Sequence, residues 1–360
     1  MRDGGPGTVV GDAIDVAFVV PRSGPAGIFG PSCEACGLLA ADEINADGGL
    51  LGRELRLRVV DGGRAPAVVA EEVAALVASG AAQAVTGWHI SAVRQELAPR
   101  LAGRAPYVYT PLYEGGERAA GVFLAGETPD RQVLPALRFM ADELDVRTWC
   151  VVGDDYVWPQ ISARVVRRFA RVAPRVRVLD EVFVPLGTRD YGAAVARVQR
   201  SGAQGVLMLL VGSDAVEFNR AFAAAGLRGI VRLSPLMEEN MLLASGAEAT
   251  VGLYAAAGFF ETLPTAAGLD FSRRYSARFG VRAPVLNAPG ESCYEGLTLL
   301  SQLVSRAGGL GVPALAAAAP GLVYDSPRGT VAMAGNHLRQ RVYLARADGL
   351  AFDVLAELTP

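Results

Sequence analysis

The chain has 360 residues and a net charge of −3, with 51% hydrophobic and 20% charged residues, which suits a globular protein with room for two domain cores. Arginines are spread along the chain without a basic block, which argues against nucleic acid as a partner. Only two histidines, His89 and His337, are present, so the composition also argues against a metal site built on histidine clusters.

The two ends of the sequence bear on where the protein works. Residues 1–12 are polar and glycine-rich and contain no apolar segment of the kind that forms a signal peptide. The uncharged stretch 307–324 contains Pro313 and Pro320 and is not expected to span a membrane. We therefore expect no direct membrane insertion. The location is periplasmic or extracytoplasmic if an export signal was removed, and cytoplasmic otherwise.

Residues 16–61 predict a β-loop-α-β unit. An apolar strand, 16–20, is followed by a loop rich in glycine and proline, and Ser32 is expected to cap a helix over 33–45. The alternating segment 55–60 predicts a second strand, which ends at Asp61. The loop glycines lie three apart rather than in a dinucleotide fingerprint, and no G-x-x-x-x-G-K-S/T motif occurs. We therefore interpret the loop as a crossover that lines a cleft, and no cofactor is expected.

Two of the four cysteines, Cys33 and Cys36, have the C-x-x-C spacing of a thioredoxin-type redox site at a helix start. The residues between them are Glu34 and Ala35, whereas such sites usually carry Gly-Pro or Pro-His. The alternative, two small buried residues that pack near the start of the helix, is favoured.

Strands and helices alternate along the rest of the chain. The expected helices are 65–78, 91–104, 129–144, 159–173, 190–200, 214–225, 266–279 and 288–306, with a short one within 234–240. The expected strands are 84–85, 107–109, 122–124, 148–152, 176–183, 205–210, 230–233, 254–258 and several short ones after 323, of which 341–345 is the clearest. This order predicts an α/β protein with two doubly wound, parallel-sheet (Rossmann-like) lobes and a ligand crevice at the carboxyl ends of the strands.

Four loops at predicted strand ends carry aromatic and hydroxyl side chains suited to a small polar ligand. They are the segments 88–91, 109–111, 156–158 and 211–213. Ser91 opens a predicted helix and could act only as its cap, and Trp158, which precedes Pro159, could act only in core packing. The joint occurrence of such side chains at four strand ends favours a binding site.

The segment 23–61 resembles the opening of the type I periplasmic binding proteins of the Leu/Ile/Val receptor type. The similarity rests on a Ser-Gly loop at 23–24, the run 43–49 and the pair Gly52-Arg53. The resemblance implies two lobes joined by a three-segment hinge, with crossings near Pro129, Gly258 and Pro327. Lobe I would then comprise 13–128 plus 259–326 and lobe II 129–258 plus 327–360, with the ligand cleft between them.

Several later segments are similar to the amide and urea receptor branch of that family, which includes the short-chain amide sensor of the aliphatic amidase operon. They are 86–94, 109, 113–115, 153–159, 211–213, 325–329 and 336–337. The resemblance places Ser91, Tyr109, Tyr156 and Trp158 where that sensor lines its amide pocket. His89 and Trp158 replace tyrosines of the sensor, and Pro111 lies one place from its Thr-Pro pair. The full expected ligand-binding set is His89, Ser91, Tyr109, Pro111, Tyr156, Trp158, Gly212, Ser213 and Glu238.

The expected function is a receptor that closes over a small amide-, urea- or amino-acid-like ligand. It would be the solute-binding component of an ABC transporter with a permease partner, or a cytoplasmic sensor that controls a regulatory partner in amide utilisation. An enzyme is the third class. No G-x-S-x-G elbow occurs, and the carboxylate pairs 154–155 and 238–239 are interpreted as a helix-start cluster and a solvated face.

The residue three after Ser91 separates the possible ligand classes. Amino-acid receptors of the family typically hold the ligand carboxylate with a serine and a threonine three residues later, and the amine with an acid from the second lobe. Here Arg94 stands at the threonine position and is expected to face solvent or a neighbouring loop, and Glu238 is the candidate acid. The aromatic set around Ser91 therefore favours a compact neutral ligand with one carbonyl and one N–H group.

Overall fold

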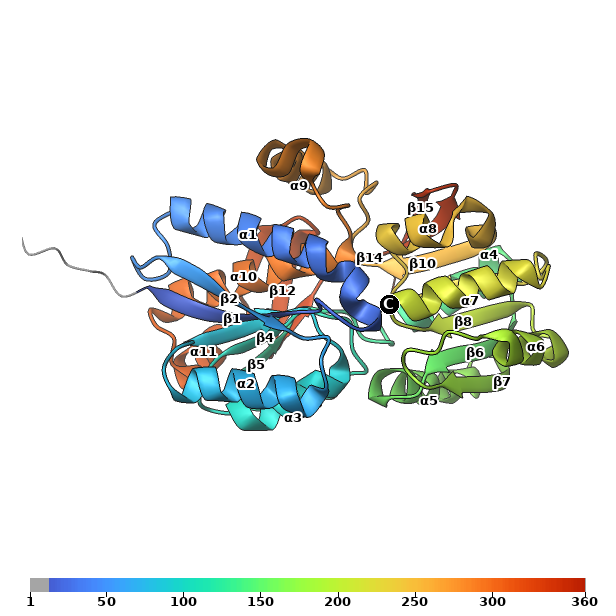
Figure 1. Ribbon diagram of the computed structural model, residues 1–360, viewed down its shortest axis with the longest axis horizontal. Helices are drawn as coiled ribbons and strands as arrows, with labels where there is room; N and C mark the ends of the chain where they lie inside the picture. Colours follow the sequence, from blue (N-terminus) through green and yellow to red (C-terminus); the bar gives the residue numbers. More distant parts are fainter. Residues whose placement is uncertain (1–12, 360) are drawn as a thin grey trace, which may run out of the picture.

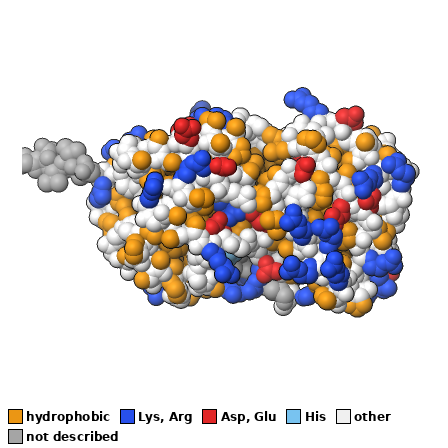
Figure 2. Space-filling model, turned by 90° about the horizontal axis from the view of Figure 1, so that it is seen from below, with side chains coloured by type: hydrophobic (Ala, Val, Ile, Leu, Met, Phe, Trp, Pro, Cys, Tyr) orange, Lys and Arg blue, Asp and Glu red, His pale blue; other side chains and the backbone are white. Residues whose placement is uncertain are grey.

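A computed structural model describes residues 13–359, which form two α/β lobes side by side (Figure 1). The two-lobed fold expected from the alternation of strands and helices is confirmed, and both sheets are mostly parallel. Within the described residues no helix is long and apolar enough to cross a bilayer. Figure 2 shows arginine and carboxylate side chains interspersed on the face seen from below.

Lobe I contains a sheet of eight strands in the order β11-β12-β13-β5-β4-β3-β1-β2. The strands are β1 (Ile14–Val20), β2 (Leu55–Asp61), β3 (Ala84–Gly87), β4 (Tyr107–Tyr109), β5 (Val122–Leu124), β11 (Val323–Ser326), β12 (Gly329–Ala334) and β13 (His337–Arg339). Its helices are α1 (Gly30–Ala46), α2 (Pro66–Ala78), α3 (Ser91–Leu101), α9 (Ala266–Phe279), α10 (Ala288–Ala307) and α11 (Val312–Ala318), with the short 3-10 helices η1 (Pro25–Phe29) and η3 (Gly280–Arg282).

The central strand β1 shows why helices cover both faces of this sheet. Its side chains alternate between the faces, as strand geometry requires. Val16, Phe18 and Val20 join the core that includes α1 and α10, whereas Ala17 and Val19 join the smaller core of α2 and α3. All five are fully buried, which explains why the sequence of this strand is an unbroken apolar run.

Lobe II contains a sheet of seven strands in the order β15-β14-β10-β9-β8-β6-β7. The strands are β6 (Thr148–Asp154), β7 (Arg177–Val184), β8 (Gly205–Leu209), β9 (Val231–Ser234), β10 (Leu253–Ala257), β14 (Val342–Asp348) and β15 (Ala351–Leu358). Its helices are α4 (Val133–Glu143), α5 (Val157–Ala170), α6 (Gly192–Ser201), α7 (Ser213–Ala224) and α8 (Glu239–Ser245), with the 3-10 helix η2 (Ala247–Thr250).

The chain passes between the two sheets three times, and the last passage lies later than expected. The crossing predicted near Pro327 is wrong, because Ser326 and Gly329 pair across a hairpin whose tip is Pro327-Arg328. Strands β12 and β13 then remain in the lobe I sheet, where His337 pairs with Leu124 of β5. The third crossing is therefore the short segment 340–341, between β13 and β14.

The first helix also begins differently from the prediction. Ser32 is not its N-cap, since α1 starts at Gly30 directly after η1. A Cβ at Gly30 would lie 2.3 Å from the carbonyl oxygen of Pro21, so this early start needs glycine. Cys33 and Cys36 are fully buried in the core, and burial raises the pKa of both thiols well above the usual value. Neither cysteine therefore has the thiolate character that redox chemistry requires.

A buried arginine, Arg328, connects the hinge segments through hydrogen bonds and an ion pair. Arg328 Nε donates to Glu291 Oε2 at 2.6 Å on α10, and its Nη1 donates to Gln340 Oε1 at 2.6 Å on the third crossing. The same Nη1 lies 3.5 Å from Glu127 Oε1 on the first crossing, and that oxygen accepts a hydrogen bond from Gly258 N on the second. The Arg328 side chain therefore links segments from all three crossings.

Candidate functional site

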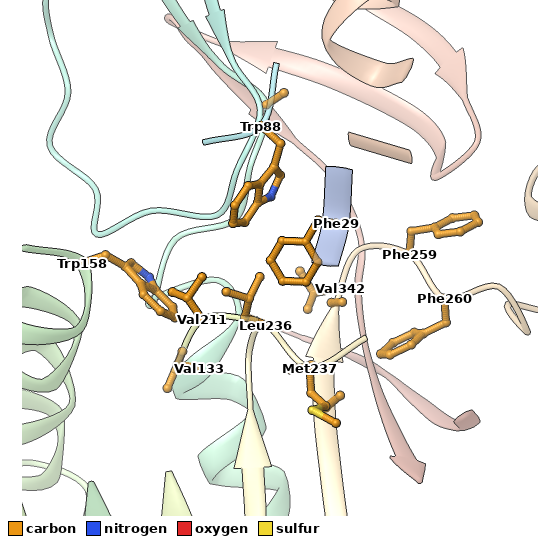
Figure 3. Packing of buried hydrophobic residues seen from close by; sticks show 14 of the residues in the cluster. Phe29, Trp88, Val133, Trp158, Val211, Leu236, Met237, Phe259, Phe260 and Val342 are labelled. Atoms are coloured by element: carbon orange, nitrogen blue, oxygen red, sulfur yellow. The ribbon is translucent and has the colours of Figure 1, made fainter. Parts of the chain in front are cut away.

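The carboxyl ends of the two sheets face each other, and a small cavity lies between them. Its volume is about 10 Å³, and nine residues from both lobes line it: Trp88, Ile90, Ser91, Tyr109, Pro111, Leu112, Tyr156, Trp158 and Leu236. Figure 3 shows Trp88 and Phe29 of lobe I close to Trp158, Val211 and Leu236 of lobe II; of these five, Trp88, Trp158 and Leu236 line the cavity. The structure thus brings five of the predicted ligand residues, Ser91, Tyr109, Pro111, Tyr156 and Trp158, around one cavity.

A second, deeper cavity of about 20 Å³ adjoins the first. The two share Trp88, Leu112 and Leu236 as walls, and the deeper one reaches Arg328 and Glu127 at the hinge. A space of 10–20 Å³ is about what one water molecule occupies. In this arrangement of the lobes the space is too small for a larger ligand, which therefore requires the lobes to move apart.

Ser91 is the first residue of α3, and its side chain does not cap the helix. Ile90 is the N-cap, and the Ser91 hydroxyl instead donates to Glu114 Oε2 at 2.7 Å. The Tyr109 hydroxyl lies 3.4 Å from Ser91 Oγ and donates to the carbonyl oxygen of His89 at 3.0 Å. The cap-only alternative for Ser91 is therefore wrong. The hydroxyl protons of Ser91 and Tyr109 are therefore both donated to acceptors within lobe I.

His89 lies behind the cavity rather than on its wall. Its Nε2 is 2.6 Å from the Tyr107 hydroxyl, its Nδ1 is 3.3 Å from the carbonyl oxygen of Val19, and the ring is fully buried. Burial lowers the pKa of His89 to about 3, so the ring is neutral at physiological pH. The neighbouring Trp88 is the residue that faces the cavity, and sequence reasoning missed it although consecutive residues of an extended segment point to opposite sides.

A buried ion-pair network lies directly behind Ser91. Arg94 pairs with Glu114 and Glu117, and its guanidinium lies over the rings of Tyr109 and Tyr113 at 5.4 and 5.0 Å. Arg94 is only 3% exposed, so of the two expected surroundings, solvent or a neighbouring loop, the structure shows the loop, since Glu114 and Glu117 lie between β4 and β5. Two carboxylates surround this one cation, and Glu114 connects it to the Ser91 hydroxyl. Glu114 lies in the segment 113–115 that carries the family resemblance, but the sequence does not predict its contact with Ser91, which lies 23 residues earlier in the chain.

Lobe II contributes a free hydroxyl and an aromatic wall. Tyr156 is the N-cap of α5, and its hydroxyl makes no hydrogen bond to another residue within 13–359. Burial, followed by the nearby Asp154 carboxyl, raises the pKa of Tyr156 well above its usual value, so the group remains a proton donor. Trp158 is 3% exposed and lies 6.3 Å from the Tyr156 ring, so it serves both in core packing and in lining the cavity.

Gly212 and Ser213 lie at the junction of the lobes and are not cavity residues. A Cβ at Gly212, where φ is +54°, would come within 2.1 Å of the carbonyl oxygen of Pro25 in lobe I. Ser213 Oγ lies 3.5 Å from the Asp214 carboxylate. Neither residue lines the two cavities described above. Gly212 instead permits a close backbone approach between lobes.

Glu238 is likewise a contact between lobes rather than a cavity residue. It caps α8 by accepting from Asn240 N and Met241 N, and it also accepts from Asn287 Nδ2 at 2.6 Å. Asn287 is the N-cap of α10, so the caps of two helices in different lobes meet here. The interpretation of Glu238 and Glu239 as a solvated face is wrong, because both are buried where the lobes meet. Burial raises the pKa of Glu238 to about 7 and that of Glu239 to about 8.

Within the described part of the chain, no three His, Cys, Asp or Glu side chains cluster in a way that could hold a metal ion. Asp154 and Asp214 form a buried carboxyl pair below Tyr156, where Asp154 Oδ2 accepts from Val211 N at 2.8 Å. Burial and then the nearby Asp214 carboxyl raise the pKa of Asp154 well above its usual value, and burial also raises the pKa of Asp214.

A family model and a curated relative both identify the chain as similar to periplasmic binding proteins. The family model described as periplasmic binding protein matches residues 13–351. A curated relative, the Leu/Ile/Val-binding protein homolog 6 of Brucella melitensis, is 29% identical over 230 residues, which are 59% of this chain and 57% of the relative. The chain therefore matches little more than half the length of that relative.

Solved structures extend the likeness to nearly the full chain. A solute binding protein of an ABC transporter from Rhodopseudomonas palustris HaA2, in complex with p-hydroxybenzoic acid, is similar with a TM-score of 0.84, 21% identity and 96% coverage of both chains. The branched-chain amino acid transporter substrate binding protein LivJ from Streptococcus pneumoniae, in complex with isoleucine, is similar with a TM-score of 0.83 and 16% identity, covering 97% of this chain and 100% of that one. At these identities the likeness concerns the fold.

Proposed function

The chain belongs to the periplasmic binding protein family, and from this premise we propose that it is a receptor whose lobes close over a compact neutral solute with an amide or urea group. Lobe closure is a hinge motion that contacts from both lobes to one ligand stabilise. Here Ser91 and Tyr109 approach the cavity from lobe I, and Tyr156 and Trp158 approach it from lobe II.

The observation that carries this proposal is the uncharged wall of the cavity. Its nine lining residues are aromatic, aliphatic or hydroxyl-bearing, and none of them is charged. A buried ammonium or carboxylate without a partner is costly, whereas a neutral amide needs only matched hydrogen bonds. The free Tyr156 hydroxyl can donate to a carbonyl oxygen, and the lone pairs of Ser91 Oγ can accept from an amide N–H. A small neutral ligand therefore fits this lining better than a zwitterion.

A small carboxylic acid, including an amino acid, is the second candidate ligand class. It is favoured by Arg328, whose side chain lies on the wall of the deeper cavity, and by the ligands named for the similar structures. Against it, Arg328 already has carboxylate partners in Glu291 and Glu127, and Arg94 has partners in Glu114 and Glu117. Neither guanidinium is left without a counter-ion, so we rank the neutral ligand first.

A thermal-shift panel tests the ligand class. Short amides and urea are compared with aromatic acids and branched-chain amino acids at equal millimolar concentrations and at pH 7. A ligand that binds only the folded state raises the melting temperature. At a concentration a hundredfold above its dissociation constant, it adds about 2.7 kcal/mol to the free energy of unfolding. We expect shifts with amides. A shift with an amino acid or an aromatic acid and none with any amide would remove the amide proposal and leave the receptor fold unaffected.

The cellular role that we propose is solute binding for an ABC importer, in the periplasm and with a permease as partner. The similar structures named above support this role, because both are described as transporter binding proteins. The alternative remains a cytoplasmic sensor of an amide-utilisation operon, with a regulatory protein as partner. Gene deletion separates them: loss of uptake of the labelled ligand indicates transport, whereas intact uptake with lost induction of amide-degrading enzymes indicates the sensor.

A further inference from the structure

The hydrogen-bonding protons around Ser91 are fully assigned in the structure. A serine hydroxyl has one proton to donate and two lone pairs with which to accept. The Ser91 proton goes to Glu114 Oε2 at 2.7 Å, in a buried, charge-assisted bond of the stronger kind. The Tyr109 proton goes to the carbonyl oxygen of His89. Two hydroxyls of lobe I therefore approach the cavity with lone pairs and not with protons.

Glu114 is held in place to accept this proton. Its other oxygen, Oε1, pairs with Arg94 Nη2, and the side chains of both residues are no more than 3% exposed. Arg94 is in turn fixed by Glu117 and by the rings of Tyr109 and Tyr113. Glu114 itself does not line the cavity. A carboxylate can only accept hydrogen bonds, so this arrangement leaves Ser91 no choice of direction.

From this geometry we propose that Glu114 is a positioning residue that sets the ligand class, because it takes the Ser91 proton and so makes the cleft select an N–H group over a carboxylate oxygen. The inference deepens the proposed function and rests on it for the ligand's place in the cleft. The complementary donor is the Tyr156 hydroxyl of lobe II, which is free to donate to a carbonyl oxygen. An amide bridges the lobes with its N–H toward Ser91 and its carbonyl toward Tyr156.

A carboxylate of the same shape fits this arrangement poorly. One of its oxygens would meet the lone pairs of Ser91 Oγ, and the Glu114 carboxylate lies directly behind that oxygen. The free backbone N–H at the start of α3 can serve the carbonyl oxygen of an amide or an acid equally, so it does not discriminate between them. Leaving one buried hydrogen bond unmade commonly changes affinity by about tenfold or more. We therefore expect Ser91 to favour an amide over the matching acid by about tenfold in affinity.

The test is Glu114→Gln, which has the same shape as the native side chain and reverses one hydrogen bond. The glutamine oxygen can still accept from Arg94, while its amide nitrogen donates to Ser91 Oγ and frees the Ser91 proton for the ligand. Affinities for butyramide and butyrate, and for benzamide and benzoate, are measured by calorimetry at pH 7. We expect the amide-to-acid affinity ratio to fall by about tenfold relative to the wild type.

Two further variants separate this role from a merely structural one. Glu117→Gln removes the same charge from the same arginine without touching Ser91, so its amide-to-acid ratio should equal that of the wild type. Ser91→Ala removes the group through which Glu114 acts, so adding Glu114→Gln to it should change the ratio by less than twofold. Circular dichroism and thermal melts establish that each variant is folded.

The outcomes distinguish this inference from the proposed function. An unchanged ratio in folded Glu114→Gln, or an equal change in Glu117→Gln, would overturn the role of Glu114 while the wild type still bound amides. A wild type that bound only acids would remove the amide proposal. In that event Glu114→Gln must still tighten acid binding by about tenfold for the role of Glu114 to stand.

Discussion

The contact between Asn287 and Glu238 gives a direct test of how the lobes are held closed. Asn287 performs two tasks at once: its Oδ1 accepts from Gly290 N at 2.8 Å and caps α10, and its Nδ2 donates to Glu238 Oε2 at 2.6 Å across the lobes. Asn287→Ser separates these tasks, because serine is also a good N-cap but is too short to reach Glu238. The variant should keep lobe I stable and weaken only the contact between lobes.

The size of the effect follows from the type of bond that is lost. A hydrogen bond to a charged group contributes about 2 kcal/mol, which corresponds to roughly a thirtyfold change in an equilibrium constant. The ratio of open to closed protein should therefore rise roughly thirtyfold. The apparent ligand affinity should fall in step with the fraction of protein that is closed. Retention of the cap should limit the loss in stability to less than about 1 kcal/mol.

Three measurements check this expectation. Small-angle scattering of the free protein should show a larger radius of gyration for Asn287→Ser, calorimetry should show weaker ligand binding, and urea unfolding should show a small change in stability. Asn287→Ala is the matched comparison, since it also removes the cap and should lose about 1 kcal/mol more. If Asn287→Ser leaves both the radius of gyration and the affinity unchanged, the contact between Asn287 and Glu238 does not hold the closed state.

Three further outcomes are expected. Trp158→Ala should weaken ligand binding by about 2 kcal/mol or more and also cost about 3–5 kcal/mol of stability, whereas Trp158→Phe should retain most of both; equal binding by Trp158→Ala and the wild type would exclude a ligand contact. Cys33→Ala with Cys36→Ala should keep ligand affinity within about threefold, because both thiols are buried in the core, and disulfide reduction by the parent protein would contradict a packing role. Stability in urea should fall as the pH rises from 6 to 8.5, because the pKa values of Glu238 and Glu239 are raised from 4.5 to about 7 and about 8; their stabilising contribution is complete below about 4.5 and is lost as the pH rises through the folded values. Glu239→Gln should flatten this dependence, and a stability that rises over the same range would contradict it.

The alternation of strands and helices, and the loops at strand ends, could be predicted from the sequence because both depend on local patterns. Apolar runs such as Val16–Val20 mark buried strands, and the side chains that follow parallel strands meet at one edge of a sheet. The same reasoning predicts that Ser91, Tyr109 and Tyr156 lie near one another, and all three line one cavity. Their contribution to ligand binding stays a prediction.

The features that the sequence could not supply depend on contacts between distant segments. Ser32 looks like a helix cap, but its hydroxyl lies 2.9 Å from Asn287 Oδ1, 255 residues further along the chain. Glu238 looks exposed until α8 is placed against lobe I, where its carboxylate meets Asn287. The family resemblance places the third crossing too early, because Pro327-Arg328 is the tip of a hairpin whose two strands become evident only from their pairing. Local sequence propensity gives no information about contacts between segments that lie this far apart in the chain.

The hinge and the cleft share the same charged residues, which connects ligand binding to lobe movement. Glu127 and Arg328 line the deeper cavity, and they also join the three crossings through Gly258 and Gln340. Arg328 is surrounded by carboxyls; burial raises the pKa of Glu291, and the Arg328 guanidinium opposes that rise. A ligand that reaches the deeper cavity must pack against this wall. Any contact that favours one arrangement of Arg328 therefore also favours one geometry of the hinge, because a ligand shifts an equilibrium only by its differential interaction with the two states.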